Sequence, residues 1–364
     1  MPVFEAVILR NVCHNLLAAA GATVEEAECV AERLVEANLM GHDSHGVIRL
    51  QQYLSAIERG EIVPGASLEI VTETAASAVI DGHWGFGQVI ARQASAIGVE
   101  KARSSGLAAV TVRGANHIGR LGSYVEEVAN HGMIGLMFCN SHGAGVCVAP
   151  WGGTRPRLAT TPLAAAVPML PKPDPDGLPG MMVLDMTTSV VAEGKVRVKK
   201  NRGERTPEGW ILDRNGTPTT DPDDFYGPPR GSILPFGGQS GHKGYGLSIV
   251  VDLLAGALSG AGSTRKPGSR VANAFLLIVL DIEQFVPREE FADSVSELAR
   301  FVKSSALMEG FEEIILPGEI EQRTMAHRSS TGVFIEDETW EQITALEQKL
   351  GVEVNQDRGK VERT

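Results

Sequence analysis

The fold prediction depends most on residues 107–122, LAAVTVRGANHIGRLG. The first six of these residues are an apolar run rich in Val and Ala, and a glycine-rich turn follows without a break. Similar short runs, bounded by Gly, Pro or Asn clusters, occur at residues 77–80, 134–138, 163–168 and 181–185. Such runs are typical of β-strands. The middle of the chain is therefore predicted to form a sheet.

Helical periodicity dominates the two ends of the chain. Thr23 and Glu26 have capping-box spacing and precede an apolar stripe with a period of 3.6 residues, which predicts a helix. A second helix is expected to begin at Asp43 or Ser44. Further helices are predicted near residues 88–103, 245–258, 289–303 and 338–350, and one more strand over residues 275–282.

This order of elements predicts two domains. A discontinuous, mainly helical domain of residues 1–74 plus 240–364 is expected around an inserted α/β domain of residues 75–239. The helix at 245–258 is apolar on nearly all sides and is expected to be buried. Residues 213–242 are predicted to form a long Gly/Pro-rich loop, and loops of that length are usually functional or mobile.

The composition is that of a globular protein with an acidic balance. The 364 residues are 43% hydrophobic and 21% charged, and the formal net charge is -12. Without a basic stripe, nucleic acid is not an expected partner, and an anionic substrate needs locally placed cations. We recognise no signal peptide and no apolar run of membrane-spanning length. The four cysteines lack disulfide-scaffold or CxxC spacing, so a cytoplasmic protein with reduced thiols is expected.

Residues 41–49, GHDSHGVIR, join the first two predicted helices. Ser44 lies at the positive end of the second helix, and His45 and Arg49 share one of its faces. The planar Arg49 guanidinium suits a substrate carboxylate because it can make two parallel hydrogen bonds. A capped helix with a surface arginine explains the same residues without a ligand. No metal is predicted, since His42 and His45 have no third ligand at useful spacing.

A glycine-rich segment at residues 85–90, GFGQVI, follows a strand and opens a helix. It lacks the third glycine of a dinucleotide fingerprint, and no acidic residue ends the next strand at the expected distance. We therefore interpret these glycines as ordinary turn residues and predict that the chain has no Rossmann site.

Three further segments place polar groups where strands end or helices begin. His117 lies in the turn after the strand at 107–112, Asp185 ends the run VLD, and Lys243 and Gly244 open the apolar helix. These groups suit a base, an acid that orients a histidine, and a cation for a phosphate or carboxylate. Each also has a structural explanation: a loop histidine, a helix-capping aspartate and a solvated lysine.

Taken in order, six motifs resemble the malate/L-lactate dehydrogenase family of 2-hydroxy-acid and imino-acid oxidoreductases. They are GHDSHGVIRLQQY, NHIGRLGSY, ATTPLAAAVP, LDMTTSVVAEGKV, HKGYGL and LPGEIE, which together span nearly the whole chain. The runs ANLMGHDSHG and GHKGY are most similar to the hydroxycarboxylate branch. One departure concerns the family's GTNP, which reads Ala159-Thr160-Thr161-Pro162 here.

The resemblance implies a fold and a set of site residues. It implies a non-Rossmann nicotinamide-binding fold with a largely antiparallel sheet, in a homodimer, with 75–239 as the cofactor domain and the helical domain on the substrate side. Ser44, Arg49 and Thr160 are expected to bind substrate, and His117, His45 and Asp185 to be catalytic. The residues expected at the cofactor are Ser141, Thr160, Thr161, Pro162, Asp185, Met186, Thr187, Lys243, Gly244, Asn273, Ala274 and Phe275.

The implied function is an NAD-dependent 2-hydroxy-acid dehydrogenase, with NADP also open, acting on an acid of the malate, lactate or aryl-lactate type. Oxidation needs an anchored carboxylate and a base for the hydroxyl proton. In the alcohol-oxidising branch the resemblance favours His117 as that base, and in the imine-reducing branch His45 with Asp185. A cyclic imino-acid reductase, a ureidoglycolate-type dehydrogenase and a non-enzymatic binding protein remain alternatives.

Overall fold

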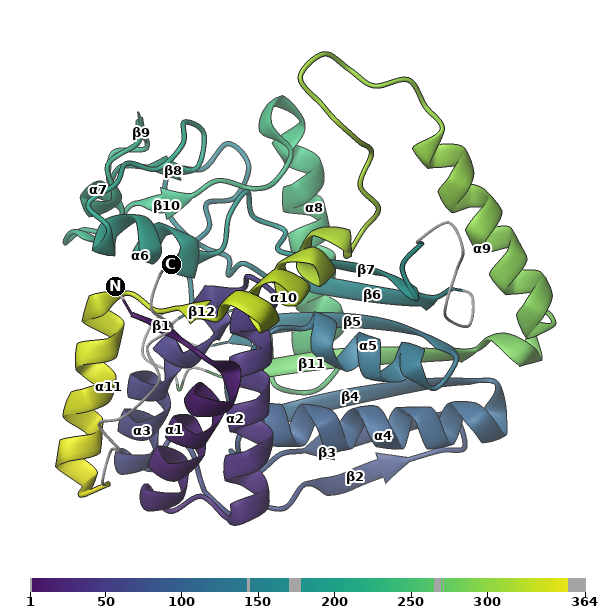
Figure 1. Cartoon of the computed structure of the whole chain (residues 1–364), viewed down its shortest axis with the longest axis horizontal. Coiled ribbons are helices and arrows are strands. Elements are labelled where there is room, and N and C mark those ends of the chain that lie inside the picture. The colour runs from purple at the N-terminus through teal and green to yellow at the C-terminus, as the bar shows by residue number, and fades with distance from the viewer. Residues whose placement is uncertain (1, 143–144, 170–177, 265–269, 271, 353–364) are drawn as a thin grey trace.

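A seven-stranded sheet organises the part of the chain that the computed structural model describes, residues 2–142, 145–169, 178–264, 270 and 272–352 (Figure 1). Five of its six described strand pairs are antiparallel, and β3 with β4 is parallel. The chain is therefore a mixed α/β protein. In spatial order the strands are β2 (Glu69–Glu73), β3 (Ser77–Asp81), β4 (Leu107–Ala115), β11 (Ala272–Asp281), β5 (Met133–His142), β6 (Leu163–Pro168) and β7 (Met181–Met186).

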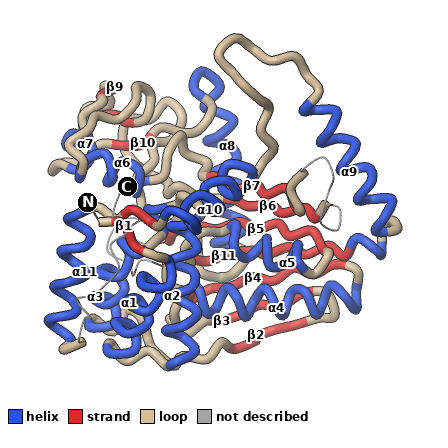
Figure 2. The backbone as a smooth tube through the Cα atoms, in the orientation of Figure 1, coloured by secondary structure: helices blue, strands red, loops and turns tan. Residues whose placement is uncertain are grey.

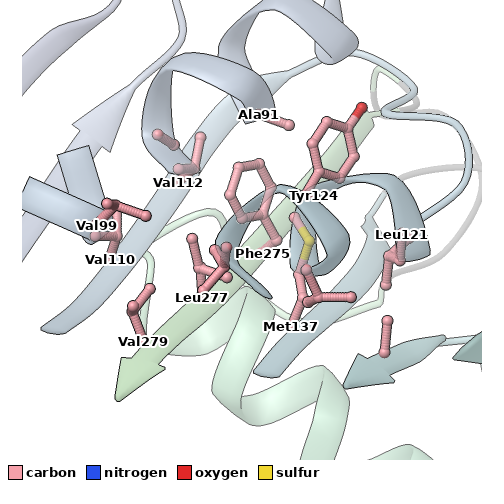
Figure 3. Close-up of a cluster of buried hydrophobic side chains, with 14 of the residues drawn as sticks. Ala91, Val99, Val110, Val112, Leu121, Tyr124, Met137, Phe275, Leu277 and Val279 are labelled. Carbon is pink, nitrogen blue, oxygen red and sulfur yellow. The ribbon is translucent and has the colours of Figure 1, made fainter. Parts of the chain in front are cut away.

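The core of this sheet is built where its apolar strands meet two helices. The helices α4 (Gly87–Ser105) and α5 (Gly122–Asn130) pack against the strands. Figure 3 shows Phe275, Leu277 and Met137 among the side chains that fill the contact. Removing this apolar surface from water is the main stabilising contribution to such a layer. Each of the five apolar runs predicted around residues 77–185 is confirmed as a strand.

The strand β11 departs from the expected division of the chain. It comes from the C-terminal segment that was assigned to the helical domain, yet it pairs with β4 and β5 in the middle of the sheet. The strand β2 also joins the sheet, and all five of its residues are exposed, so it carries no apolar alternation. The boundaries at residues 74 and 240 are therefore not where the sheet begins and ends.

A helical bundle lies at one end of the sheet (Figure 2). The helices α1 (Ala6–Ala19), α2 (Val24–Leu39), α3 (Leu50–Glu58) and α11 (Asp337–Leu350) share a second core, and β1 (Val3–Phe4) pairs with β12 (Val333–Phe334) beside it. The capping box of Thr23 and Glu26 is confirmed at the start of α2. This bundle supplies the loop that carries the GHDSHGVIR motif.

The second predicted helix begins later than expected. Two 3-10 turns, η1 (Asp43–His45) and η2 (Val47–Arg49), precede α3, and Gly46 between them is extended. The Asn38 side chain explains the break, because its Oδ1 accepts from the Val47 backbone N–H at 2.9 Å. A Cβ at position 46 would lie 2.1 Å from that Oδ1. His45 and Arg49 are therefore presented by turns rather than by one helical face.

The expected loop at 213–242 contains regular structure. Its described elements are β9 (Pro218–Thr219), α7 (Pro222–Tyr226), β10 (Ser232–Ile233) and η3 (Gly238–Ser240), and they pack with α6 (Glu193–Asn201) and β8 (Ile211–Leu212) around a small core. The short strands of this unit follow the order β10-β8-β9. It closes one side of the cavity that holds the candidate site.

The apolar helix expected to be buried is exposed along one side. It consists of α8 (Gly241–Asp252) and a π-helical turn, η4 (Leu253–Ala257), which pack on β5 and β11. Val250, Leu253 and Leu258 are nonetheless 50–59% exposed. The prediction of full burial was wrong for the single chain, because the sheet covers only one side of this helix.

The remaining described elements are η5 (Ile282–Gln284), α9 (Arg288–Lys303) and α10 (Glu319–Thr331). The four cysteines are buried and free. No helix among the described residues is both long and apolar enough to cross a membrane.

Candidate active site

A cavity of about 750 Å³ opens between the helical bundle, the end of the sheet and the α6 unit. It gathers side chains from segments far apart in the sequence. Residues named from the sequence that line it are Ser44, His45, Arg49, His117, Ser141, Thr160, Pro162, Asp185, Met186 and Thr187. The three predicted catalytic residues thus share one cavity with the predicted carboxylate anchor.

The rings of His45 and His117 stack in this cavity, with centroids 5.3 Å apart and planes 13° from parallel. Burial lowers the pKa of His45 to about 3, and the nearby Arg49 cation lowers it further. Burial and Arg49 also hold the pKa of His117 well below its usual range. Both rings are therefore neutral at pH 7 in this state, and the buried Nδ1 of His45 has no hydrogen-bond partner among the described residues.

The turn that carries His117 is held at several points. A Cβ at Gly87 would lie 2.3 Å from the Asn116 carbonyl oxygen, so only glycine lets α4 begin this close to the turn. The Asn116 amide donates to the Trp84 carbonyl at 2.6 Å. The Ile118 backbone N–H donates to Oδ1 of Asn273, on β11, at 3.0 Å. The GFG segment therefore positions His117, a structural task that its sequence does not reveal.

Tyr53 of α3 is the described hydrogen-bond partner of the His117 ring. Its hydroxyl lies 2.7 Å from Nδ1 of His117, and Nε2 of Gln88 donates to the same hydroxyl at 2.7 Å. Burial raises the pKa of Tyr53 to about 12. The sequence analysis missed both Tyr53 and Gln88. In the helix predicted from the sequence, Tyr53 follows Arg49 by four residues and so lies on the same side, which was a usable signal.

Arg49 presents its guanidinium to the cavity from a half-buried position. Nε donates to the Ser44 carbonyl at 2.7 Å, and Nη1 donates to Oε1 of Gln52 at 2.8 Å. These two bonds fix the plane of the guanidinium beside the histidine rings. A fixed planar cation next to neutral rings is suited to hold a carboxylate while the rings act on the adjoining carbon.

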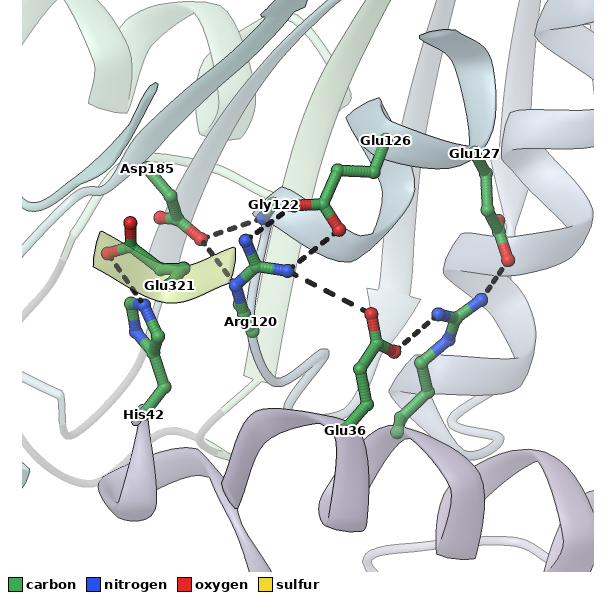
Figure 4. A network of polar contacts seen from close by, with 9 residues as sticks. Glu36, His42, Arg120, Gly122, Glu126, Glu127, Asp185 and Glu321 are labelled. Carbon is green, nitrogen blue, oxygen red and sulfur yellow. Dashed lines mark hydrogen bonds and ion pairs between the residues drawn. The ribbon is translucent and has the colours of Figure 1, made fainter. Parts of the chain in front are cut away.

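A network of ionised side chains is centred on Arg120, which also lines the cavity (Figure 4). Arg120 binds Glu126 through two hydrogen bonds of 2.7 and 2.9 Å, and its Nε lies 3.9 Å from Oδ2 of Asp185. Asp185 also accepts from the Gly122 backbone N–H at 2.7 Å. Burial raises the pKa of Asp185, and the Arg120 cation opposes that rise. Among the described residues, no hydrogen bond joins Asp185 to His45 or His117, so its expected partnership with a catalytic histidine is not seen.

Several residues expected at the cofactor lie behind the cavity wall. Thr161 is buried, with its hydroxyl 2.6 Å from that of Thr188 and 2.8 Å from that of Ser248. Its φ of 29° is left-handed, a conformation that asparagine tolerates better than threonine. This preference gives a physical reason for the asparagine of the family's GTNP.

The residues on β11 and α8 that were predicted to contact the cofactor do not line the cavity either. Asn273 donates to the Ser141 hydroxyl at 3.2 Å, whereas Ala274 and Phe275 are buried in the sheet. Lys243 is exposed, and Gly244 packs against the backbone of Phe236, which does line the cavity. Asn273 and Gly244 therefore support wall residues.

The cavity wall fits a ligand that combines a flat ring with anionic groups. Pro162, Met186 and Val190 supply apolar surface. Arg120 and Arg230 line the same cavity, and the Nε atom of each is buried without a hydrogen-bond partner among the described residues. A nicotinamide dinucleotide has this chemistry. No group of three potential metal ligands occurs among the described residues.

Comparisons with known proteins show the family of the chain. A model of the malate/L-lactate dehydrogenase family matches residues 4–344. Malate dehydrogenase from Pyrococcus horikoshii is 37% identical over 349 residues, covering 93% of each chain. Its solved structure has a TM-score of 0.85 and 34% identity, covering 97% of this chain and 96% of that one. Hydroxycarboxylate dehydrogenase B from Escherichia coli K12 is 33% identical over 354 residues, covering 96% of this chain and 94% of its own.

A reductase of a cyclic imine has a similar structure. Delta1-piperideine-2-carboxylate reductase from Pseudomonas syringae has a TM-score of 0.80 and 29% identity, covering 95% of this chain and 100% of that one. The same architecture thus occurs in enzymes named for hydroxy acids and in one named for an imino acid.

Proposed function

The chain belongs to the malate/L-lactate dehydrogenase family and is an oxidoreductase of hydroxy acids. We propose that it interconverts a small 2-hydroxy acid and its 2-oxo acid, with NAD or NADP as the coenzyme. The observation that carries the proposal is the half-buried Arg49 guanidinium, fixed in one cavity with the stacked, neutral rings of His45 and His117. An anchored carboxylate places the adjoining carbon and its oxygen beside those rings.

Arg49 anchors the substrate carboxylate, assisted by Ser44 and Thr160. A charge-assisted pair with a planar guanidinium is both strong and directional. The carboxylate also offsets the Arg49 cation that lowers the pKa of both histidines. His117 exchanges the proton of the substrate oxygen, and His45 holds that oxygen in place.

Ser141, Pro162, Met186, Thr187 and Asp185, which line the cavity, would hold the dinucleotide. When bound, its nicotinamide ring supplies or accepts the hydride. Asn273 supports this wall through Ser141, and Lys243 assists from the start of α8. Thr161, Gly244, Ala274 and Phe275 shape the wall from behind. The division into a sheet-based cofactor domain and a helical substrate domain is part of the same proposal.

The favoured substrate carries a second anionic group, as malate does. Lys195 and Arg230 line the cavity in addition to Arg49. Among the described residues, no ion pair is formed by Lys195, so its charge is available to a ligand. A net charge of -12 on the whole chain makes such a local cation the expected means of binding a dianion.

A homodimer is proposed because large apolar surfaces remain exposed on the single chain. Leu253 of η4 is 50% exposed, and Leu298 and Phe301 of α9 are 56% and 76% exposed. Exposed apolar side chains of this size are candidates for an interface. Sedimentation analysis of the wild type and of Phe301→Glu tests this point. A cytoplasmic location is expected from the four free thiols.

Reduction of a cyclic imino acid is the second candidate, favoured by the likeness to the Pseudomonas syringae reductase. This reaction would use the same carboxylate anchor, Arg49, and the same hydride transfer. It differs because the proton goes to the substrate nitrogen and not to a substrate oxygen. Assays with a 2-oxo acid, with and without added amine, separate the two. Turnover that requires the amine would favour the imine reductase.

A spectrophotometric screen of 2-oxo acids with NADH and NADPH in parallel tests the proposed function. We expect oxidation of at least one reduced nicotinamide with oxaloacetate or a similar acid, and less with pyruvate. Failure of every acid with both coenzymes, with and without amine, would favour a non-enzymatic binding protein.

A further inference from the structure

The hydrogen bonds around Tyr53 determine which nitrogen of His117 carries a proton. The Gln88 amide donates to the Tyr53 oxygen, so one lone pair of that oxygen is occupied. The hydroxyl proton still needs an acceptor, because Tyr53 is 2% exposed and an unpaired buried donor is costly. Nδ1 of His117, at 2.7 Å, is that acceptor. A neutral ring that accepts at Nδ1 carries its proton on Nε2.

This arrangement suits one direction of the reaction. With Nε2 protonated, His117 can donate to the oxo oxygen of a 2-oxo acid. The ring does not first store a second proton at neutral pH, because burial between the stacked His45 of η1 and Tyr53 disfavours the imidazolium. The Arg49 cation of η2 adds to this effect until a substrate carboxylate offsets it. Once Nε2 gives up its proton, Nδ1 must gain one for the ring to stay neutral. The bonded donor at Nδ1 is the hydroxyl of Tyr53.

We propose that Tyr53 is the proton source of the reduction and that His117 passes the proton on as a ring that stays neutral. The inference rests on the proposed function. As C2 of the acid receives the hydride with its electron pair, the Nε2–H bond of His117 breaks and the product O–H bond forms. The O–H bond of Tyr53 breaks and an Nδ1–H bond forms. Oxidation is the reverse, with the tyrosinate as final acceptor.

The negative charge left on Tyr53 has three stabilising neighbours. The Gln88 amide and the new Nδ1–H of His117 both donate to the oxygen. The Arg49 cation favours the tyrosinate over longer range, and burial opposes it. Tyr124 of α5 is a further titratable group that interacts with Tyr53, while Arg197, Glu193 and Tyr226 interact with Arg49. Tyr53 and Gln88 are thus positioning residues that act through His117.

The pH dependence separates this relay from an imidazolium mechanism. Reduction uses Tyr53 with its proton on, so its kcat should stay flat between about pH 6 and 9. Oxidation needs tyrosinate, so its kcat should rise about tenfold per pH unit on the alkaline side. If protonation of a histidine controlled the reaction, the pH profile of kcat would instead show an inflection near pH ~6.5.

Tyr53→Phe, Gln88→Leu and the control Tyr245→Phe provide the test, with kcat and KM measured in both directions against pH. Tyr245 is half-buried in the separate core beside α6. Tyr53→Phe should lower kcat by roughly 10²-fold or more, abolish the alkaline rise and change KM little. Gln88→Leu should move that rise to higher pH by about one to two units, because the tyrosinate loses a donor. Tyr245→Phe should behave like wild type.

A second readout keeps the test independent of a folding defect in Tyr53→Phe. If two protons are transferred in the same step, the reduction rate of the wild type should depend on the deuterium fraction of the solvent along a curve. In Tyr53→Phe only one proton is transferred, and the dependence should be a straight line. An inflection near pH ~6.5 in wild type, or an unchanged profile in both Tyr53→Phe and Gln88→Leu, would overturn the relay. Absence of wild-type turnover with any acid would instead reject the proposed function.

Discussion

The two sides of the cavity use opposite electrostatic solutions. The neutral side consists of His45, His117, Tyr53 and Gln88, none of which carries a formal charge. The rings of His45 and His117 stack, and the Tyr53 hydroxyl forms hydrogen bonds with His117 and Gln88. The ionic side is centred on Arg120, whose side chain is 1% exposed between Glu126, Glu36 and Asp185. On the neutral side a moving proton leaves charge only on Tyr53, where hydrogen-bond donors can stabilise it. On the ionic side, removal of Arg120 takes away the cation that its neighbouring carboxylates share.

One turn supplies both sides. His117 and Arg120 are three residues apart, and Gly119 between them has a φ of 77°. That left-handed conformation is open to glycine without strain. The loop after β4 therefore presents a neutral ring to one side and a cation to the other. The difference between the two sides teaches that the ionic side fixes the turn and the neutral side carries the chemistry.

Removal of Arg120 should have the largest effect on stability. Arg120→Met leaves three carboxylates without their shared cation, and breaking a buried pair typically costs about 3–5 kcal/mol. Denaturant unfolding should show a loss of that order. Arg103→Met is the matched control, since Arg103 pairs with Glu100 at the surface and its loss should cost under about 1 kcal/mol. Equal stability of the two variants would mean that the ionic side does not hold the turn.

Arg49→Lys tests the anchor that faces the neutral side. The lysine keeps the charge but cannot make the two fixed bonds to Ser44 and Gln52, nor present a planar fork to the substrate. We expect kcat/KM to fall by about 10² or more. Arg10→Lys, at an exposed position, should leave kcat/KM unchanged. Near-normal kinetics for Arg49→Lys would show that the carboxylate is anchored elsewhere.

Asp185→Asn asks whether the ionic side takes part in proton transfer. The amide keeps the size of the side chain, and Asp185 makes no hydrogen bond to either catalytic histidine among the described residues. We expect kcat to fall less than about tenfold and the shape of the pH profile to persist. Loss of the alkaline rise in this variant would mean that the two sides share the proton.

Lys243→Ala should have the smallest effect. Lys243 stands in the first turn of α8, outside the cavity wall, so it can act on an anionic coenzyme only over some distance. An exposed ion pair of this kind is worth up to about 1 kcal/mol, or at most roughly fivefold in Kd. Fluorescence titration with the reduced coenzyme measures this change. A loss of binding above tenfold would bring Lys243 into the site.

Local patterns in the sequence predicted the separate elements better than their arrangement. The five central strands came from apolar runs with clear boundaries, and the α2 capping box came from its spacing. The placement of β11 at the centre of the sheet could not be predicted this way, because strand order depends on contacts between distant segments. The exposed side of α8 was missed for a related reason, since an all-round apolar pattern does not say what covers each face.

The candidate site was predicted in part. His45, His117, Arg49 and Asp185 were named from their turns and strand ends, and they line one cavity. Tyr53 and Gln88 were missed because each lies inside a helix and resembles an ordinary core or polar residue. The partner of Asp185 was also unexpected. Its carboxylate lies beside Arg120 and Gly122, from a turn 63 residues away from it along the chain, and sequence spacing does not determine that contact.

Single-turnover reduction by His117→Ala and His45→Ala tests the division between the two sides most directly. Each variant is preloaded with reduced coenzyme and mixed with the best 2-oxo acid. The loss of nicotinamide absorbance is then followed, and coenzyme Kd is measured separately. We expect His117→Ala to keep its coenzyme Kd and to slow hydride transfer by roughly 10²-fold or more. We expect His45→Ala mainly to raise the substrate concentration at which hydride transfer reaches half of its maximal rate. Normal hydride transfer in His117→Ala together with its loss in His45→Ala would contradict the account.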